Sequence, residues 1–204
     1  TWMDAKVGDW VVTPRHGKPV EIQALWYNAL RVVQQYAEAF ADPEFAAICR
    51  STADRAAAAF ATLFWNHDQG CLFDCIGPEG PDPSIRPNQI FAVSLQHPLL
   101  QGDRASQVVE VVRRELLTPM GLRTLAPGDP RYRPHYRGGV LERDSAYHQG
   151  TVWPWLTGPF LTAYLTVEGD SEAARAQART WLQPLLEHMD AGCIGQICEV
   201  ADGD

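Results

Sequence analysis

The chain of 204 residues has the length of one domain, and its 46% hydrophobic and 21% charged residues are typical of a globular protein and exclude wholesale disorder. Because 25 acidic residues outnumber 17 basic ones, the net charge is −8, and we expect no nucleic-acid partner and no membrane partner. The sequence shows neither an apolar run of about 18 residues nor a signal peptide, so we expect a cytoplasmic protein.

Two long helices are expected first. From Glu21 to Ala41, apolar side chains recur every three to four residues, which is typical of an amphipathic helix. This helix is expected to begin after Pro19 and to end before Asp42, because the proline after Asp42 disfavours helical continuation. A similar pattern runs from Phe45 to Trp65 and contains a run of four alanines, which favours a helix.

The middle of the chain alternates loops with shorter helices. Glycine and proline are frequent from Trp65 to Arg86, which predicts a loop with a short strand over Cys71–Asp74. A proline precedes the short helix that we expect over Asn88–Leu95. Asp103 is the expected N-cap of the next helix, which ends at Leu117.

The last part of the chain repeats this alternation. Residues Thr118 to Tyr147 form a second segment that we expect to be irregular. Helices are expected over Gln149–Glu168 and Ser171–Met189, and a polar tail follows from Ala191 to Asp204. Strand signals are weak throughout, and the helix–loop–helix order resembles an α/α toroid. We therefore predict an all-α fold whose long loops carry the function.

Acidic residues occur near both ends of the chain. Asp4 lies close to Trp2 and to a lysine, so burial and charge would shift its pKa in opposite directions. Glu199 opens the acidic, glycine-containing segment Glu199–Asp204. Glycoside hydrolysis needs two carboxyl groups, one to protonate the leaving oxygen and one to activate water or to attack the anomeric carbon. The alternatives are a surface aspartate and a solvated or calcium-like acidic turn.

Polar loops and aromatic residues suggest how sugars could be bound. Three segments place charged or amide side chains before helices, where they could recognise hydroxyl groups or simply cap helices: Pro14–Glu21, Arg86–Gln89 and Tyr147–Trp155. The seven Trp, six Tyr and seven Phe could line a cleft that meets the faces of sugar rings, or they could pack the core. Glu142 and Asp144 compete for a catalytic role, although Arg143 between them makes an ordinary ion pair equally plausible.

Other kinds of site are disfavoured by the sequence. The odd number of cysteines predicts reduced thiols, and their spacing does not match a zinc site: Cys49, Cys71, Cys75, Cys193 and Cys198. The sequence also lacks the nucleophile elbow, the phosphate-binding loop, the dinucleotide-binding fingerprint and the HExxH motif. We therefore expect neither a metal nor an organic cofactor.

Four segments in order resemble the glycogen debranching enzyme family, and more narrowly its C-terminal amylo-α-1,6-glucosidase domain in the bacterial form. They are the first thirty residues beginning TWMDAKVGDW, RPNQ at Arg86–Gln89, YHQGTVWPW at Tyr147–Trp155, and EVADGD at Glu199–Asp204. The resemblance implies that residues 1–204 form the second part of an (α/α)6 catalytic toroid, with the upstream domain and the closing helix missing. It departs from the family at Val200-Ala201, where bulkier residues are usual.

The resemblance also implies an activity and a site. The substrate would be glycogen, limit dextrin or another α-glucan, hydrolysed with inversion, with Asp4 as general acid and Glu199 as base. The residues expected to bind the substrate are Trp2, Asp9, Trp10, Glu21, Arg86, Asn88, Gln89, His148 and Trp153. Two alternatives stay open: a related glucosidase acting on trehalose, glucosylglycerate or N-glycan glucose, and a non-catalytic scaffold that binds glucan.

Overall fold

The computed structural model describes residues 1–191 and 194–204, so the expectation for Cys193 lies outside the described residues. Helices make up 52% of the structure and strands 12%. The helices are α1 (Val20–Ala39), α2 (Pro43–Leu63), α3 (Phe91–Ser94), α4 (Gly102–Leu116), α5 (Val140–Ala146), α6 (Thr157–Val167) and α7 (Glu172–Ala191), with 3-10 turns η1 (Pro87–Ile90) and η2 (Pro154–Leu156). The strands are β1 (Lys6–Val7), β2 (Trp10–Val11), β3 (Lys18–Pro19), β4 (Trp65–Asn66), β5 (Cys71–Leu72), β6 (Cys75–Gly77), β7 (Gly80–Asp82), β8 (Leu117–Thr118), β9 (Gly121–Arg123) and β10 (Val152–Trp153).

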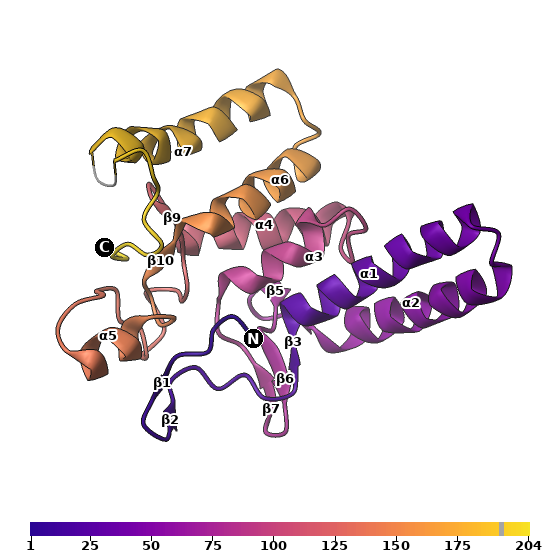
Figure 1. The fold of residues 1–204 in the computed structure, drawn as a ribbon, viewed down its shortest axis with the longest axis horizontal. Helices are drawn as coiled ribbons and strands as arrows, with labels where there is room; N and C mark the ends of the chain where they lie inside the picture. The colour runs from indigo at the N-terminus through magenta and orange to yellow at the C-terminus, as the bar shows by residue number, and fades with distance from the viewer. Residues whose placement is uncertain (192–193) are drawn as a thin grey trace.

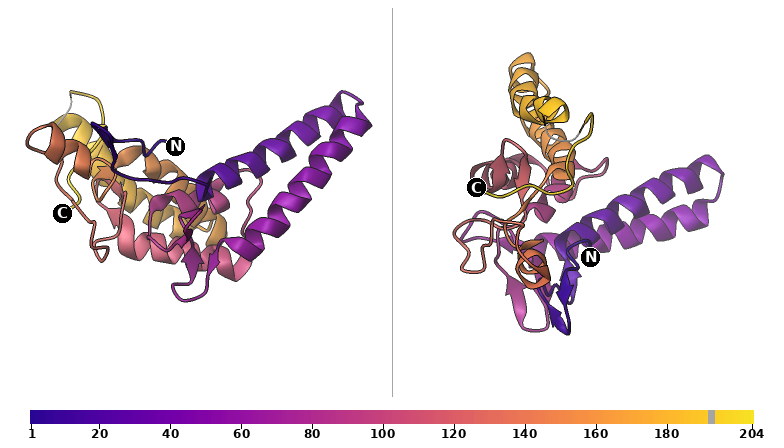
Figure 2. Two further views of the ribbon diagram at one scale, coloured as in Figure 1. Left: turned by 90° about the horizontal axis from the view of Figure 1, so that it is seen from below. Right: turned by 60° about the vertical axis from the view of Figure 1, so that its left-hand side comes forward.

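The prediction of an all-α fold built as an (α/α)6 toroid is wrong. The described residues form four small antiparallel sheets, β1–β2, β4–β5, β3–β6–β7 and β8–β9–β10, and their helices do not close into a ring (Figures 1 and 2). Each strand has only two or three residues. A strand this short cannot show the alternation of apolar and polar residues that predicts strands, which is why the loops seemed irregular from sequence.

The first two helices confirm the sequence prediction. They pack as an antiparallel hairpin that projects from the rest of the molecule as an arm (Figures 1 and 2). Pro19 is the N-cap residue of α1, and Asp42 caps α2 by accepting a hydrogen bond from the Phe45 amide at 3.0 Å. Proline at the first position of α2 suits that cap, because its missing N–H would have no partner there.

Other boundaries correct the prediction. Helix α4 has Gln101 as its N-cap residue, and Asp103 lies inside the first turn, where its charge favours the positive end of the helix dipole. Helix α6 begins at Thr157 instead of Gln149, because residues before it form β10 and the 3-10 turn η2. The segment that we expected to be irregular contains β9 and the short helix α5.

The core joins the base of the arm to the later helices. Val20 of α1 and Phe60 of α2 pack into one buried cluster with Val108 of α4 and Phe160 of α6. Helix α7 packs on α6 through Trp181, whose ring lies 5.5 Å from the ring of Phe160. At one end of this core, residues 1–5, 86–89 and 147–153 meet through buried polar contacts. None of the described helices combines the length and the apolar character needed to cross a membrane.

Candidate active site

An aromatic cluster joins the start of the chain to the segment after α5. We use this term for Trp2, Tyr147, His148, Trp153 and Trp155. The Trp2 indole meets the rings of His148, Trp153 and Trp155 edge-on, with centroid distances of 5.2, 5.4 and 5.2 Å. His148 stacks on Trp153 at 5.2 Å and lies 4.7 Å from Tyr147. Trp153 is buried whereas Trp155 is 46% exposed, so the cluster reaches from the core to the surface.

Two carboxylates from opposite ends of the chain border this cluster. We call Asp4 and Glu199, both exposed, the carboxylate pair. Burial of the ring and the negative charge of Glu199 raise the pKa of Tyr147 to about 12, with a smaller effect of Asp4. The phenol is therefore protonated at neutral pH, and both carboxylates are near enough for their charge to influence it.

The tail that carries Glu199 is fixed to the sheet β8–β9–β10. Ala201 and Val152 exchange two backbone hydrogen bonds, of 2.9 and 3.0 Å. The Gly203 amide donates to the Pro134 carbonyl at 2.7 Å, and the Arg123 side chain donates to the Gly203 carbonyl at 2.7 Å. The position of Glu199 is therefore set by backbone contacts on its C-terminal side.

Two further residues of the tail serve this attachment. The Asp202 carboxylate accepts a hydrogen bond from the Tyr136 amide at 2.9 Å and lies 3.1 Å from Nδ1 of His135. Burial acts to raise the pKa of Asp202, but these two hydrogen bonds outweigh it and the pKa is lowered. At Gly203, a side chain would collide with the Gly150 carbonyl, so only glycine fits. The acidic segment thus has one residue at the site and others that anchor it.

A buried relay of polar side chains holds Trp2 in place. We use this term for Asn88, Asp74, Arg15 and Glu21. Asn88 accepts a hydrogen bond from the Trp2 indole at 2.8 Å and donates to Asp74 at 2.9 Å. Arg15 donates to Asp74 at 2.6 Å and binds both oxygens of Glu21, at 2.5 and 2.6 Å. Although burial acts to lower it, these bonds and charges raise the pKa of Arg15, so the guanidinium is always charged.

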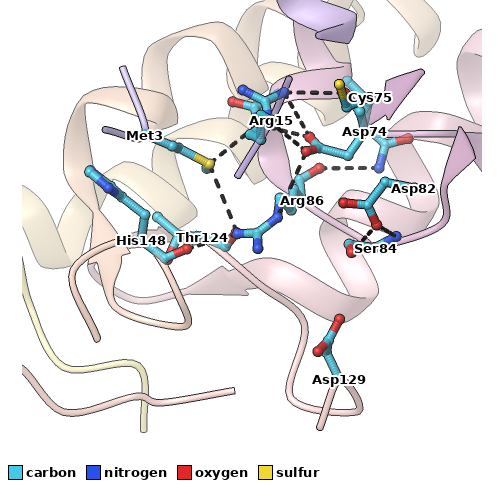
Figure 3. Close-up of polar contacts among 12 residues, drawn as sticks. Met3, Arg15, Asp74, Cys75, Asp82, Ser84, Arg86, Thr124, Asp129 and His148 are labelled. Carbon is cyan, nitrogen blue, oxygen red and sulfur yellow. Dashed lines mark hydrogen bonds and ion pairs between the residues drawn. The ribbon is translucent and has the colours of Figure 1, made fainter. Parts of the chain in front are cut away.

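Arg86 links the relay to the aromatic cluster. Its guanidinium donates to the backbone carbonyls of His148 at 2.7 Å and Thr124 at 3.0 Å, and to Gln149 at 2.8 Å. Its Nε lies 3.8 Å from Asp74, so Arg15 and Arg86 converge on one carboxylate (Figure 3). Two positive and two negative side chains therefore balance inside the protein. Burial lowers the pKa of Arg86, and its contacts are structural.

The buried ring of His148 lacks hydrogen-bond partners in the part of the chain that the structure describes. The residue is 1% exposed, and neither ring nitrogen has a hydrogen-bond partner among the described residues. Burial lowers its pKa to about 4, and the opposing charge of Asp4 only partly offsets this effect. The imidazole is therefore neutral at pH 7, with one N–H donor and one acceptor nitrogen. Buried polar atoms without partners are rare in proteins and often mark functional positions.

The predicted site residues fall into three groups. Trp2, Asp4, His148, Trp153 and Glu199 lie in or beside the aromatic cluster. Glu21, Arg86, Asn88 and Gln89 are buried behind it, and Gln89 binds the Leu72 amide at 3.1 Å. Asp9 and Trp10 lie on the β1–β2 hairpin, where Asp9 is exposed and 3.8 Å from Lys6, and the aromatic cluster has no ring contact with Trp10 in the described part of the chain.

Sequence reasoning missed three residues of this arrangement. Tyr147 was part of a motif that we singled out, but nothing in the sequence showed that its ring packs against His148 and Trp153. Arg15 and Asp74 are distant in sequence, and their pairing depends on the packing of β3 against β6. A buried charge in a loop gives no periodic signal. Glu142 and Asp144, the competing carboxylates, lie on α5.

Two cavities of the molecule lie away from Asp4 and Glu199, and the described residues form no metal site. A cavity of about 580 Å³ borders Ser84 and Arg131, and another of about 480 Å³ borders His16 and Cys75. Neither is lined by Asp4 or Glu199. Over residues 1–191 and 194–204, no three His, Cys, Asp or Glu side chains are grouped so that they could hold a metal ion.

Comparison with known proteins connects this arrangement to a family. A family profile described as amylo-alpha-1,6-glucosidase matches residues 1–204. The glycogen debranching enzyme of Saccharomyces cerevisiae is 37% identical over 89 residues, which are 41% of this chain. The matched region covers 6% of the yeast enzyme, so the chain spans a small part of that relative.

Proposed function

The chain belongs to the amylo-alpha-1,6-glucosidase family, and from this premise we propose that it hydrolyses α-1,6 linkages at the branch points of glycogen or limit dextrins. One observation carries the proposal: the segments of Asp4 and Glu199 meet at the aromatic cluster, because the Trp2 ring packs against Trp153 and Ala201 pairs with the neighbouring Val152. An enzyme of this kind needs two carboxyl groups that flank the scissile bond. Because both are exposed, the end of a branched polymer could reach them.

The proposed reaction uses the pair as acid and base. Asp4 donates a proton to the glycosidic oxygen as the bond between that oxygen and the anomeric carbon breaks. Glu199 accepts a proton from the water that attacks the anomeric carbon on the opposite face. The products are a shortened glucan and glucose with inverted configuration. Asp4 is then ionised and Glu199 protonated, and exchange with solvent restores both, so the scheme needs no cofactor.

The aromatic cluster supplies the proposed sugar contacts. The faces of Trp2 and Trp155 could pack against the C–H faces of glucose units, and Trp155 is exposed enough to do so. The neutral His148 ring offers a donor and an acceptor for sugar hydroxyls. Glu21, Arg86 and Asn88 act indirectly in this scheme, because their polar atoms already bind protein groups.

The test replaces each carboxyl group with its amide. In the full chain, Asp4→Asn and Glu199→Gln should each lower glucose release from a limit dextrin by about a hundred- to ten-thousandfold, with unchanged circular dichroism. Glu142→Gln and Asp144→Asn are matched controls that should retain activity, since these carboxylates lie on α5. Proton NMR of the first product should show β-glucose if the reaction inverts configuration. Wild-type turnover in Glu199→Gln, or α-glucose as the first product, would contradict the proposal.

A further inference from the structure

A cavity of about 350 Å³ lies beside the β1–β2 hairpin. Its walls come from the hairpin, from the loop before α5, and from α5 and the residues after it. The residues that line it are Trp10, Val11, Val12, Pro14, Pro130, Arg131, Arg133, Ser145 and Gln149, so neither Asp4 nor Glu199 takes part. Ligand sites have volumes of about 300–1,000 Å³. This cavity is therefore large enough to hold a ligand and is separate from the carboxylate pair.

Trp10 is the largest apolar side chain of this cavity, and it is 46% exposed. The hairpin that carries it is closed by a turn at Gly8, with φ of 58°, and by a hydrogen bond of 3.1 Å from the Val12 amide to the Ala5 carbonyl. The Gln149 side chain donates to the Val12 carbonyl at 2.9 Å and so ties the hairpin to the other wall. Much of the indole thus stays available to a ligand while its backbone is fixed.

Two arginines supply the polar groups of the cavity. Arg131 is neutralised, because it donates to both oxygens of Asp129 at 2.9 and 2.8 Å. Arg133 is exposed and forms no ion pair with a carboxylate of the described residues, and it donates to the Ser145 hydroxyl at 3.4 Å. Its backbone is fixed, since its amide donates to the Gln149 carbonyl at 2.6 Å. A guanidinium carries five N–H donors, so Arg133 has donors to offer a ligand.

The chemistry of the cavity favours a neutral sugar over an ion. An indole packs against the C–H face of a sugar ring, and a guanidinium donates to neighbouring hydroxyl groups. A cation finds no carboxylate among the residues that line the cavity. An anion finds a single unmatched positive charge, that of Arg133, on a chain whose net charge of −8 repels it.

The cavity also has a neighbour that could receive further sugar units. Pro130 and Arg131 line both this cavity and the cavity of about 580 Å³ described above. The second cavity adds Gln69, Glu115 and Asp129, whose side chains can bind hydroxyl groups. Two adjoining hollows suit a chain of several sugar units better than a single sugar.

We propose that these two cavities form a second glucan-binding site, at which Trp10 packs against a sugar ring and Arg133 donates to hydroxyl groups. This inference rests on the proposed function, which supplies the class of ligand: a linear stretch of an α-glucan between its branch points. A polymer held at this site stays near the carboxylate pair, which raises the effective concentration of its branch points there. The site binds the chain and takes no part in breaking the bond.

Fluorine NMR of the full chain labelled with 5-fluorotryptophan gives the first test. The Trp10 signal is identified by its loss in Trp10→Phe. Maltoheptaose, a linear oligosaccharide without an α-1,6 linkage, should shift this signal to saturation, and Arg133→Met should weaken the affinity about tenfold. Arg137→Met is the matched control, because Arg137 is exposed on the same loop but lines neither cavity.

Three results of this titration would overturn the inference. They are a Trp10 signal that maltoheptaose does not move, an equal loss of affinity in the two arginine variants, and a signal that moves with inorganic phosphate alone. The last result would make the cavity an anion site. Because maltoheptaose is not a substrate of the proposed reaction, the titration does not depend on turnover.

Affinity electrophoresis in gels that contain glycogen gives the second test. Trp10→Ala should be retarded several-fold less than the wild type, and Trp10→Phe, which keeps an aromatic face, should lose less. Trp26→Ala is the control, since Trp26 on α1 is 53% exposed and lines neither cavity. Wild-type retardation of Trp10→Ala would contradict the inference. If Asp4→Asn hydrolyses dextrin normally, the proposed function fails, while both binding measurements still decide whether this second site exists.

Discussion

The buried relay and the carboxylate pair both consist of charged residues, but their surroundings are opposite. Arg15, Glu21 and Asp74 have side chains that are at most 4% exposed, and each charge is matched by close partners. Asp4 and Glu199 are exposed, and no ion pair with a basic side chain is seen for either of them among the described residues. A charge in the relay is fixed and cannot react, whereas a charge in the pair can reach water and substrate.

The contrast separates two roles among the motif residues, since some support the structure and others face solvent. Trp2 links the two regions, because its indole N–H binds Asn88 of the relay while its ring packs in the aromatic cluster. The relay is therefore a support for the wall of the site. Changes in the relay should alter stability first, and changes at the pair should alter turnover first.

The largest stability loss is expected when the relay loses Arg15. Arg15→Met leaves Glu21 and Asp74 buried without their partner, which should lower the free energy of unfolding by about 3–5 kcal/mol. Urea unfolding of the full chain measures this loss. Arg113→Met is the matched control: its exposed pair with Glu110 should contribute less than about 1 kcal/mol. Equal losses in the two variants would remove the distinction between buried and exposed charges.

Sequence reasoning found the regular part of this fold more readily than the site. The boundaries of α1 and α2 agree with prediction to within two residues, because a long period of apolar positions and a proline at each start define them. The sheets escaped prediction because their strands are too short to show a pattern. Their pairing depends on contacts such as that between β10 and β9, whose residues are distant in sequence.

Motif matching likewise identified residues without showing what they do. Asp9 and Trp10 follow Asp4 closely in sequence, but the turn at Gly8, with φ of 58°, places them on the β1–β2 hairpin. Glu21 and Asn88 have the polar groups that bind sugars, yet both are buried and bonded to protein atoms. Burial is a property of the whole fold, so one segment of sequence cannot reveal it.

A pH dependence should come from His148, which lies in the aromatic cluster that joins the two regions. Its pKa of about 4 is below the ordinary 6.5, so the fold favours the neutral ring. As the pH falls below 6.5, the unfolded chain binds a proton that the folded chain does not. The free energy of unfolding should therefore fall by about 2 kcal/mol between pH 7 and pH 5 from this residue.

Comparing variants isolates the contribution of His148. His148→Phe keeps an aromatic ring but cannot titrate, so its unfolding free energy should change less between pH 7 and pH 5 than that of the wild type. His16→Phe replaces an exposed histidine and should keep the wild-type dependence. Urea unfolding at both pH values gives the comparison. A wild-type dependence in His148→Phe would mean that the imidazole is not held neutral by burial.

A smaller stability change than at Arg15, accompanied by an effect on function, is expected at Asn88, where the relay meets Trp2. Asn88→Leu keeps the side-chain volume but leaves the Trp2 indole and Asp74 each without one partner, which should cost about 1–3 kcal/mol of stability. Gln89→Leu should cost a similar amount, because it removes the bond to the Leu72 amide. Only Asn88→Leu releases Trp2, so only this variant should lower kcat/KM, by about tenfold or more. If both variants lower kcat/KM equally, the loss reflects general destabilisation. A difference between them would show that the relay acts on the site through one tryptophan.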